Sequence, residues 1–171
     1  MSSQSTGPLA GIRVVDLCTV IMAPMAARIL GDLGADVIKV EGAESDFMRD
    51  FVPKRNAGMG GITMNLHRNK RAMMLDLKSK PGHRAMLDLV ATSDVFMSNM
   101  RPAALARLNL AADDLLAVQP ELVYCGAVGF GSDGPYAGRA AYDDVIQSVS
   151  GMATMRSWSG DEPALVSSTI A

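Results

Sequence analysis

Basic residues in this chain stand where a helix is expected to begin, and they could hold a phosphate-bearing ligand. Arg101 precedes Pro102, a residue type that commonly opens helices, and Arg107 follows five residues later. Helix-end amides and guanidinium groups can jointly bind phosphate groups. The two arginines are equally compatible with a solvated surface. The residue types therefore admit a phosphate ligand without requiring one.

The sequence lacks the motifs of nucleotide binding, metal binding and nucleophilic serine catalysis. The pattern G-x-x-x-x-G-K-[ST] does not occur, and the segment 18–24 (CTVIMAP) lacks the glycines of a dinucleotide-binding turn. His67 and His83 lie far apart with no carboxylate at ligand spacing, so we expect no metal site and assign neither histidine a role. The run 148–151 (SVSG) is not a nucleophile elbow. These absences disfavour a dinucleotide dehydrogenase, a metal centre and a serine hydrolase.

The elements that must position the basic residues begin with a βαβ unit. A β-prone run covers 13–17, a helical stretch opens at Pro24 and ends at Gly34, and a second strand covers 36–40. This order implies parallel pairing and a right-handed crossover.

The alternation of strands and helices continues beyond this unit. Further strands are expected over 72–76, 94–98 and 122–128, and the last is apolar enough to be buried on both faces. We predict an α/β fold with a doubly wound, mostly parallel, Rossmann-like sheet. Helices are expected over 81–90, 102–108, 112–118 and 143–151.

Residues 42–71 interrupt this alternation. The segment is rich in glycine, asparagine, methionine and charge and has no periodicity, which predicts a long surface loop or functional excursion. Its last three residues, 69–71 (NKR), form a basic cluster that is typical of a solvated flank.

Ligands of open parallel sheets bind beyond the carboxyl ends of the strands. In this chain those ends carry 19–21 (TVI), Asp76 with Lys78, 99–101 (NMR) and 129–131 (GFG). We therefore expect these four segments to converge on one rim of the sheet.

Composition restricts the function classes further. The 171 residues are 49% hydrophobic, which fits an ordinary globular domain, and their net charge of −2 leaves no basic excess for binding nucleic acid. Two isolated cysteines suit a reducing compartment, so the cytoplasm is the expected location. No apolar run is long enough to span a membrane, and residues 1–7 do not resemble a signal peptide.

Several separated motifs together resemble the family III CoA-transferases, a group that includes formyl-CoA transferase, carnitine CoA-transferase and α-methylacyl-CoA racemase. The resemblance covers the chain from residue 7, and the motifs occur in family order and spacing. They are 7–17 (GPLAGIRVVDL), 30–41 (LGDLGADVIKVE), 69–71 (NKR), 75–78 (LDLK), 99–102 (NMRP), 129–131 (GFG), 134–135 (GP), 141–143 (AYD), Gln147 and 150–151 (SG).

The resemblance implies a CoA-binding fold in which two subunits interlock like links of a chain. CoA would be a substrate, with no tightly bound cofactor, and Arg107 would meet its phosphates. Two positions depart from the family pattern: Gly42 stands where a basic residue is common, and 22–24 (MAP) replaces a small-Gly-Pro run. The resemblance places the remaining contacts at Val20, Ile21 and Met22 near the thioester, and at Leu75, Asn99 and Met100 along the cofactor.

The nucleophilic aspartate of the family aligns with the position directly after Ala171. We therefore expect residues 1–171 to be the N-terminal part of a longer protein and to be inactive, and prone to associate, when expressed alone. A carboxylate suits this role because it can take an acyl group from a thioester as a mixed anhydride. Asp143 and Asp144 are expected to cap a helix instead.

Three functions remain open. The leading hypothesis is transfer of CoA between an acyl-CoA and a small carboxylic acid by an interlocked homodimer. Racemases of the same family place histidine before the aspartate that matches Asp143, where this chain has Tyr142, and α-proton exchange needs such a base. A non-catalytic CoA-binding or assembly module is the third alternative.

Overall fold

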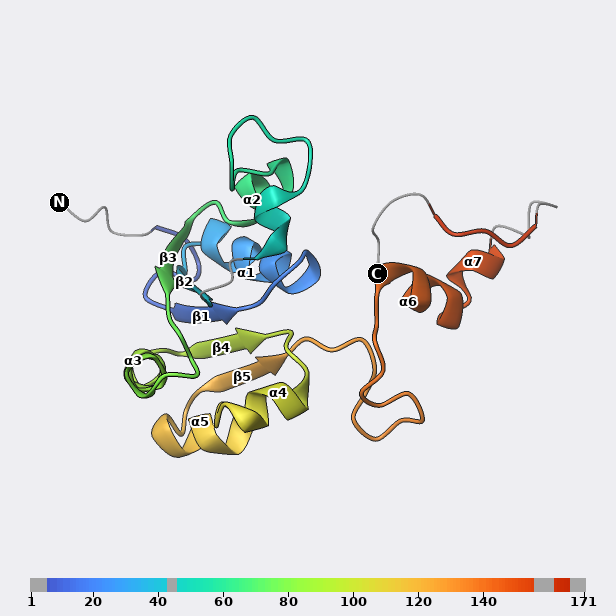
Figure 1. The fold of residues 1–171 in the computed structure, drawn as a ribbon. Helices are drawn as coiled ribbons and strands as arrows, with labels where there is room; N and C mark the ends of the chain where they lie inside the picture. The colour runs from blue at the N-terminus through green and yellow to red at the C-terminus, as the bar shows by residue number, and fades with distance from the viewer. Residues whose placement is uncertain (1–5, 43–45, 156–161, 167–171) are drawn as a thin grey trace. The chain divides into compact units, whose positions relative to one another are not determined.

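The computed structural model describes residues 6–42, 46–155 and 162–166 (Figure 1). The chain divides into two compact units, Met1–Ala127 and Val128–Ala171, which are described separately below.

The first unit contains a five-stranded sheet in which every strand pair is parallel. The spatial order is β3-β2-β1-β4-β5, which confirms the predicted doubly wound α/β fold. The chain moves outward from β1 to β3, returns to the other side of β1 with β4, and thereby creates a switch point between β1 and β4. The strands are β1 (Arg13–Leu17), β2 (Asp36–Glu41), β3 (Lys70–Met74), β4 (Val95–Ser98) and β5 (Val123–Gly126).

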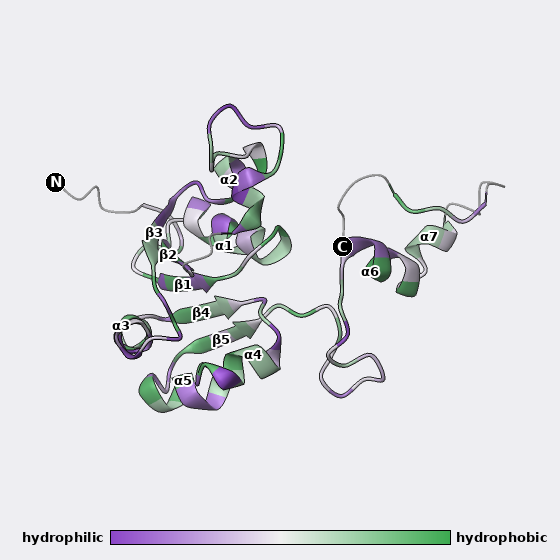
Figure 2. Cartoon of the chain, in the orientation of Figure 1, coloured by the Kyte–Doolittle hydropathy of each residue, from purple (hydrophilic) through white to green (hydrophobic). Residues whose placement is uncertain are grey.

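Helices bury apolar side chains against the two faces of this sheet. Val14 belongs to one cluster, with Ala23 and Ala27 of α1 (Met22–Asp32), while Val15 belongs to the other, as expected for alternating strand residues. The second cluster includes Phe96 and is larger, and β4 and β5 are predominantly hydrophobic in Figure 2. Helices α3 (Lys80–Val90), α4 (Pro102–Arg107) and α5 (Ala112–Val118) contribute to this second cluster.

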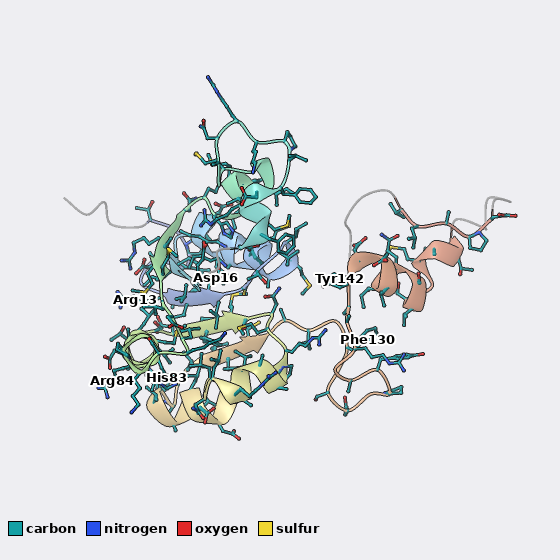
Figure 3. All side chains as sticks on the ribbon, viewed as in Figure 1. Arg13, Asp16, His83, Arg84, Phe130 and Tyr142 are labelled. Carbon is teal, nitrogen blue, oxygen red and sulfur yellow. The ribbon has the colours of Figure 1, made fainter. Side chains whose placement is uncertain are left out.

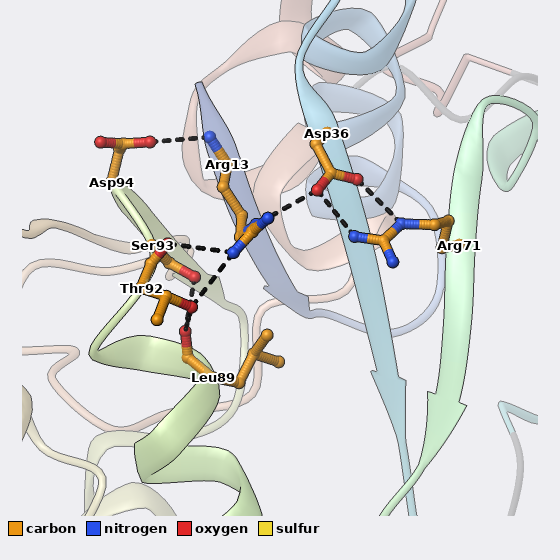
Figure 4. A network of polar contacts seen from close by, with 7 residues as sticks. All are labelled: Arg13, Asp36, Arg71, Leu89, Thr92, Ser93 and Asp94. Atoms are coloured by element: carbon orange, nitrogen blue, oxygen red, sulfur yellow. Dashed lines mark hydrogen bonds and ion pairs between the residues drawn. The ribbon is translucent and has the colours of Figure 1, made fainter. Parts of the chain in front are cut away.

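Polar contacts connect the amino ends of the strands (Figure 4). Asp36 accepts hydrogen bonds from the Arg13 Nε at 3.1 Å and from the Arg71 Nη2 at 2.7 Å, and the Arg13 backbone N–H donates to Asp94 at 2.8 Å. The Arg71 side chain remains largely exposed, as expected for a solvated flank. This network fixes one end of the sheet and leaves the carboxyl ends of the strands to form a site.

The segment between β2 and β3 contains more regular structure than the expected long loop. It includes the 3₁₀ helix η1 (Phe47–Asp50) and helix α2 (Gly61–Leu66), and strand β3 already begins at Lys70. The Asp46 side chain caps η1 by accepting the Met48 N–H at 3.1 Å. Elements of four and six residues are too short to produce a recognisable hydrophobic period, which explains their absence from the sequence prediction.

The prediction that residues 122–128 are buried on both faces is wrong. Leu122 is buried, but Val123 is 60% exposed and the strand ends at Gly126. β5 lies at an edge of the described sheet and has a strand neighbour on one side only. An apolar run therefore identified the strand but not its place in the sheet.

The second unit contains α6 (Asp143–Val149) and α7 (Met152–Met155). Gly151 lies between them with φ of 80°, so the expected helix end at a glycine is correct. Gln147 is 1% exposed, and its side-chain oxygen accepts the Val166 N–H at 2.7 Å. Among the described residues of both units, each helix is too short or too polar to cross a membrane.

Two helical glycines should respond oppositely to alanine. A Cβ at Gly82 would lie 2.1 Å from the Asp76 backbone oxygen, whereas a Cβ at Gly61 would meet only the Pro53 oxygen at 3.6 Å. In the complete protein, Gly82→Ala should lower the free energy of unfolding by about 1–3 kcal/mol through overpacking. Gly61→Ala should raise it by about 0.5–1 kcal/mol through reduced chain entropy. Chemical denaturation measures both, and the same sign for the two variants would contradict the packing around α3.

Candidate functional site

The loop after β1 is held at the switch point by a side chain from the loop after β4. The Thr19 N–H donates to Asn99 Oδ1 at 2.9 Å, and Asn99 Nδ2 donates to the Thr19 carbonyl at 2.8 Å. On the other side of this loop, the Val20 N–H donates to Asp46 Oδ2 at 3.1 Å. Val20 has a φ of 71°, a left-handed conformation that is unfavourable for a β-branched residue. These three hydrogen bonds therefore fix the loop in a shape that its sequence alone disfavours.

A hollow of about 310 Å³ lies beside this loop at the carboxyl ends of β1, β2 and β3. Its wall combines apolar side chains such as Leu75 and Met100 with charged ones. The lining residues are Leu17, Thr19, Lys39, Val40, Glu41, Gly42, Asp46, Leu75, Asp76, Leu77, Lys78, Met100 and Leu108.

A second hollow of about 340 Å³ shares Leu77, Lys78 and Leu108 with the first. The two hollows are therefore neighbours on the rim of the first unit, and together they are called the groove below. The second hollow is lined by Leu77, Lys78, Ser79, Lys80, His83, Arg107, Leu108 and Asn109.

Three of the seven expected site residues line this groove. Leu75 and Met100 line the first hollow and Arg107 the second, while Val20 adjoins Thr19 at the mouth of the first. Asn99 uses both polar atoms of its side chain on Thr19, so its visible role is to position the loop.

Ile21 and Met22, like Val20 and Asn99, lie outside the groove lining. Ile21 directly precedes α1, and Met22 is its first residue and is 49% exposed. The loop 129–131 belongs to the second unit, so its place on the rim stays a prediction.

Three buried charged side chains, Asp16, Lys39 and Lys70, support the loop after β1. Neither Asp16 nor Lys39 was singled out from the sequence. Asp16 is fully buried, and its Oδ1 accepts the Cys18 N–H at 3.0 Å (Figure 3). Lys70 Nζ lies 2.7 Å from Asp16 Oδ2 and donates to the Pro24 carbonyl at 2.8 Å. Lys39, which is 1% exposed, donates to the Cys18 carbonyl. The expectation that Lys70 belongs to a solvated flank is therefore wrong.

A signal for these charges was present in the sequence. Asp16 and Lys39 each interrupt a strand whose other residues are mostly apolar. A charge in a strand that is covered on both faces must be paired or hydrogen-bonded. What the sequence could not show is that Lys70, 54 positions away from Asp16, supplies the partner.

Burial changes the titration of groups under the loop. It lowers the pKa of Lys70, while the neighbouring Asp16 carboxylate acts in the opposite direction. Burial also raises the pKa of the Cys18 thiol, with Asp16 adding to the effect. Cys18 consequently stays a thiol at neutral pH and is unsuited to be a nucleophile.

The segment between β2 and β3 supplies a positive charge, Arg49, that pairs with Glu41 in the wall of the first hollow. Arg49 Nε donates to Glu41 Oε2 at 2.9 Å, and Nη2 pairs with Oε1. This bidentate contact lowers the pKa of Glu41, so the carboxylate stays ionised and paired. Among the described residues, no group of three histidine, cysteine, aspartate or glutamate side chains is close enough to bind a metal.

Comparison with known proteins identifies this arrangement. Residues 9–171 match the profile of CoA-transferase family III. The chain belongs to this family. It is 39% identical over 151 residues to succinate–glutarate CoA-transferase of Agrobacterium fabrum, covering 84% of this chain and 38% of that protein. It is 37% identical over 166 residues to the succinyl-CoA–L-malate CoA-transferase beta subunit of Chloroflexus aurantiacus, covering 96% and 41%.

Solved structures of the family share the fold. A CAIB/BAIF family protein from Brucella suis superimposes with a TM-score of 0.89 at 35% identity, over 95% of this chain and 44% of that one. A protein of M. tuberculosis superimposes with a TM-score of 0.85 at 30% identity, and the match covers 97% of this chain and 45% of that one. The family resemblance drawn from the motifs is confirmed, and the chain spans about two fifths of the length of these relatives.

The buried charge pair should be costly to break from one side. In the complete protein, Lys70→Met leaves Asp16 without its partner and should lower the free energy of unfolding by about 3–5 kcal/mol. The double variant Asp16→Asn with Lys70→Met should cost less than the sum of the two single changes. Arg84 forms an exposed ion pair with Asp88 and is the control. Arg84→Met should change the free energy of unfolding by no more than about 0.5 kcal/mol. Urea denaturation measures the free energy of unfolding of each variant. If the loss in the double variant equals the sum of the two single losses, Asp16 and Lys70 are not coupled.

His67 should make stability depend on pH. Neither of its buried ring nitrogens has a hydrogen-bond partner among the described residues, and burial, then Lys70 and Lys39, lowers its pKa from 6.5 to about 4. Between these values the unfolded chain binds more protons than the folded one, so the free energy of unfolding should rise from pH 5 to pH 6.5. His67→Phe should flatten that rise, whereas Met64→Ala on the exposed part of α2 should retain it. An unchanged slope in the His67 variant would refute the assignment.

Proposed function

We propose that the complete protein transfers CoA between an acyl-CoA and a small carboxylic acid. The observation that carries this proposal is the pair of neighbouring hollows at the carboxyl ends of the strands in a family III fold. Relatives that match this chain are named for exchange between CoA thioesters and succinate, glutarate, malate or oxalate. The acceptor class is therefore a dicarboxylate.

The chemistry of the groove suits an elongated ligand with an apolar arm and an anionic end. Leu75, Leu77 and Met100 offer apolar surface in the first hollow, where the pantetheine arm would lie. Lys78 and Arg107 line the second hollow, where the phosphates would lie. The thioester would then be near Thr19 and Val20, whose loop is held by Asn99 and Asp46. Ile21 and Met22 complete the set of proposed CoA contacts.

The proposed reaction uses a carboxylate nucleophile directly after Ala171. The carboxylate attacks the thioester carbonyl, the C–S bond breaks, and CoA leaves as the thiolate while a mixed anhydride forms. The CoA thiolate then attacks the enzyme's own carbonyl of this anhydride, which releases the donor acid and leaves CoA as a thioester on the enzyme carboxylate. The acceptor carboxylate attacks that thioester, displaces the thiolate and forms a second mixed anhydride. The thiolate finally attacks the acceptor carbonyl, which gives the new acyl-CoA and frees the enzyme carboxylate.

Asp143 and Asp144 lie in the first turn of α6, and Tyr142 occupies the N-cap, so the expectation that the two aspartates cap the helix is wrong by one position. Acidic side chains in a first turn are favourable toward the helix dipole.

Two observations favour transfer by a larger assembly over the alternatives. Tyr142 is 70% exposed and occupies the position where racemases carry a histidine base, which disfavours racemisation. Met22, Met25, Ile29 and Leu33 leave an apolar stripe along α1 that is 41–49% exposed. Such a stripe supports coverage by the rest of the protein or by an interlocked second subunit.

The test uses the complete protein and measures CoA transfer from succinyl-CoA to glutarate, malate and oxalate. Arg107→Ala should weaken CoA binding by about 1–3 kcal/mol, because a charge-assisted phosphate contact is lost. Alanine at the aspartate expected after Ala171 should abolish transfer and retain CoA binding.

Arg84→Ala is the matched control, since this arginine pairs with Asp88 outside the groove. Residues 1–171 alone should show no transfer. Full activity of the nucleophile variant would refute the anhydride mechanism, and unchanged CoA affinity of Arg107→Ala would remove the phosphate contact.

A further inference from the structure

The backbone of Val20, in the loop after β1, is strained. Three residues other than glycine in the described part of the chain have a left-handed φ, namely Val20 at 71°, Asn69 at 58° and Asn109 at 50°. Asparagine tolerates this conformation, whereas a β-branched residue does not. Strained residues persist only where their surroundings hold them, and they gather at functional sites. The contact that holds Val20 is therefore a candidate for a functional contact.

Asp46 makes that contact with one oxygen of a buried carboxylate. The residue is 5% exposed, and its two carboxylate oxygens hold two different segments. Oδ2 accepts the Val20 N–H at 3.1 Å, and Oδ1 accepts the Met48 N–H at 3.1 Å at the start of η1. A single oxygen is enough to cap a helix, so the second one is left for the strained loop. No step of the proposed reaction uses this carboxylate.

Asp46 is anchored to a part of the chain that is fixed independently of that loop. Arg49 of η1 forms a bidentate pair with Glu41 of β2. The Gly60 N–H donates to the Arg49 carbonyl at 2.9 Å, and a Cβ at Gly60 would lie 2.7 Å from the Met48 carbonyl oxygen. Residue 60 thus packs directly against η1, where a side chain would force a shift. The carboxylate therefore acts on the loop from a rigid base.

We infer that Asp46 is a positioning residue for CoA transfer, because its Oδ2 keeps Val20 in the left-handed conformation and fixes the loop of Thr19 and Val20 beside the reacting thioester. The place of the thioester rests on the proposed function. The inference adds to that function a residue that touches neither substrate nor nucleophile and acts through the backbone of the loop. A small misplacement of a reacting group is enough to slow a reaction strongly.

The experiment measures CoA transfer by the complete protein from succinyl-CoA to whichever of glutarate, malate and oxalate it uses best. Asp46→Ala should lower kcat about 10-fold and affect KM less, because misplacement slows the chemical step more than it weakens binding. In a protein that already carries Val20→Gly, the same change should lower kcat less than about 3-fold, because glycine adopts a left-handed φ without support. Asp50→Ala should leave kcat unchanged and is the matched control, since Asp50 lies in the same 3₁₀ helix and pairs with Lys54 at the surface.

Hydrogen exchange at residue resolution adds a measurement that does not depend on activity. The Val20 N–H of the wild-type protein should be protected, and it should exchange about 10-fold faster or more in Asp46→Ala. Asp50→Ala should leave this rate unchanged. Rapid exchange of the wild-type Val20 N–H would overturn the inference even where Asp46→Ala fails to fold.

The kinetic outcomes separate the inference from the proposed function. Equal losses of kcat with and without Val20→Gly would mean that Asp46 acts only by capping η1, and would overturn the inference while CoA transfer stands. A loss confined to KM would overturn it as well. Absence of transfer by the wild-type protein would refute the proposed function and the role of Asp46 in it, and exchange at Val20 would then report the contact alone.

Discussion

The groove depends on three buried charges that hold the loop between β1 and α1. Asp16, Lys39 and Lys70 bind the backbone of 18–24 from inside the protein, at the N–H and carbonyl of Cys18 and at the carbonyl of Pro24. Removing these charges from water is unfavourable, and their mutual contacts offset that cost only in one geometry. These contacts satisfy the backbone groups of Cys18 and the carbonyl of Pro24, which stabilises the observed loop.

The same loop is also held by side chains from two other segments, and this combination shapes the rim. Asn99 joins the ends of β1 and β4 across the switch point, while Asp46 brings the start of the excursion onto Val20. Because Asp46 also caps η1, the excursion between β2 and β3 is coupled to the first loop through one carboxylate. The wall of the first hollow thus comes from segments far apart in sequence that a few polar side chains hold together.

The sequence predicted local elements well and their surroundings less well. Short apolar runs identified the strands, and helix 112–118 was predicted with its observed bounds because Pro120 sets its end. Exposure of Val123 and burial of Lys70 were not predicted, because both depend on which strand lies beside which.

For the site, the rule for open sheets placed Leu75, Met100 and Arg107 near the groove once the family resemblance had named them. Lys39, Asp46 and Lys80 line the same groove but were not singled out, since no short motif marks a lysine on a pocket wall. His83 was given no role because a single histidine without a ligand-spaced carboxylate carries no signal in sequence.

The segment that leads toward the expected nucleophile is held by a different kind of contact. Gln147 donates to the Val166 carbonyl at 3.3 Å and accepts its N–H at 2.7 Å, so one side-chain amide satisfies both backbone groups of Val166. Asp143 accepts a further hydrogen bond from the same amide at 2.5 Å, which ties the contact to the start of α6. The loop beside the groove is thus stabilised by buried charges in the first unit, and the contact of α6 with Val166 by a buried amide in the second. Catalysis by the proposed mechanism requires both.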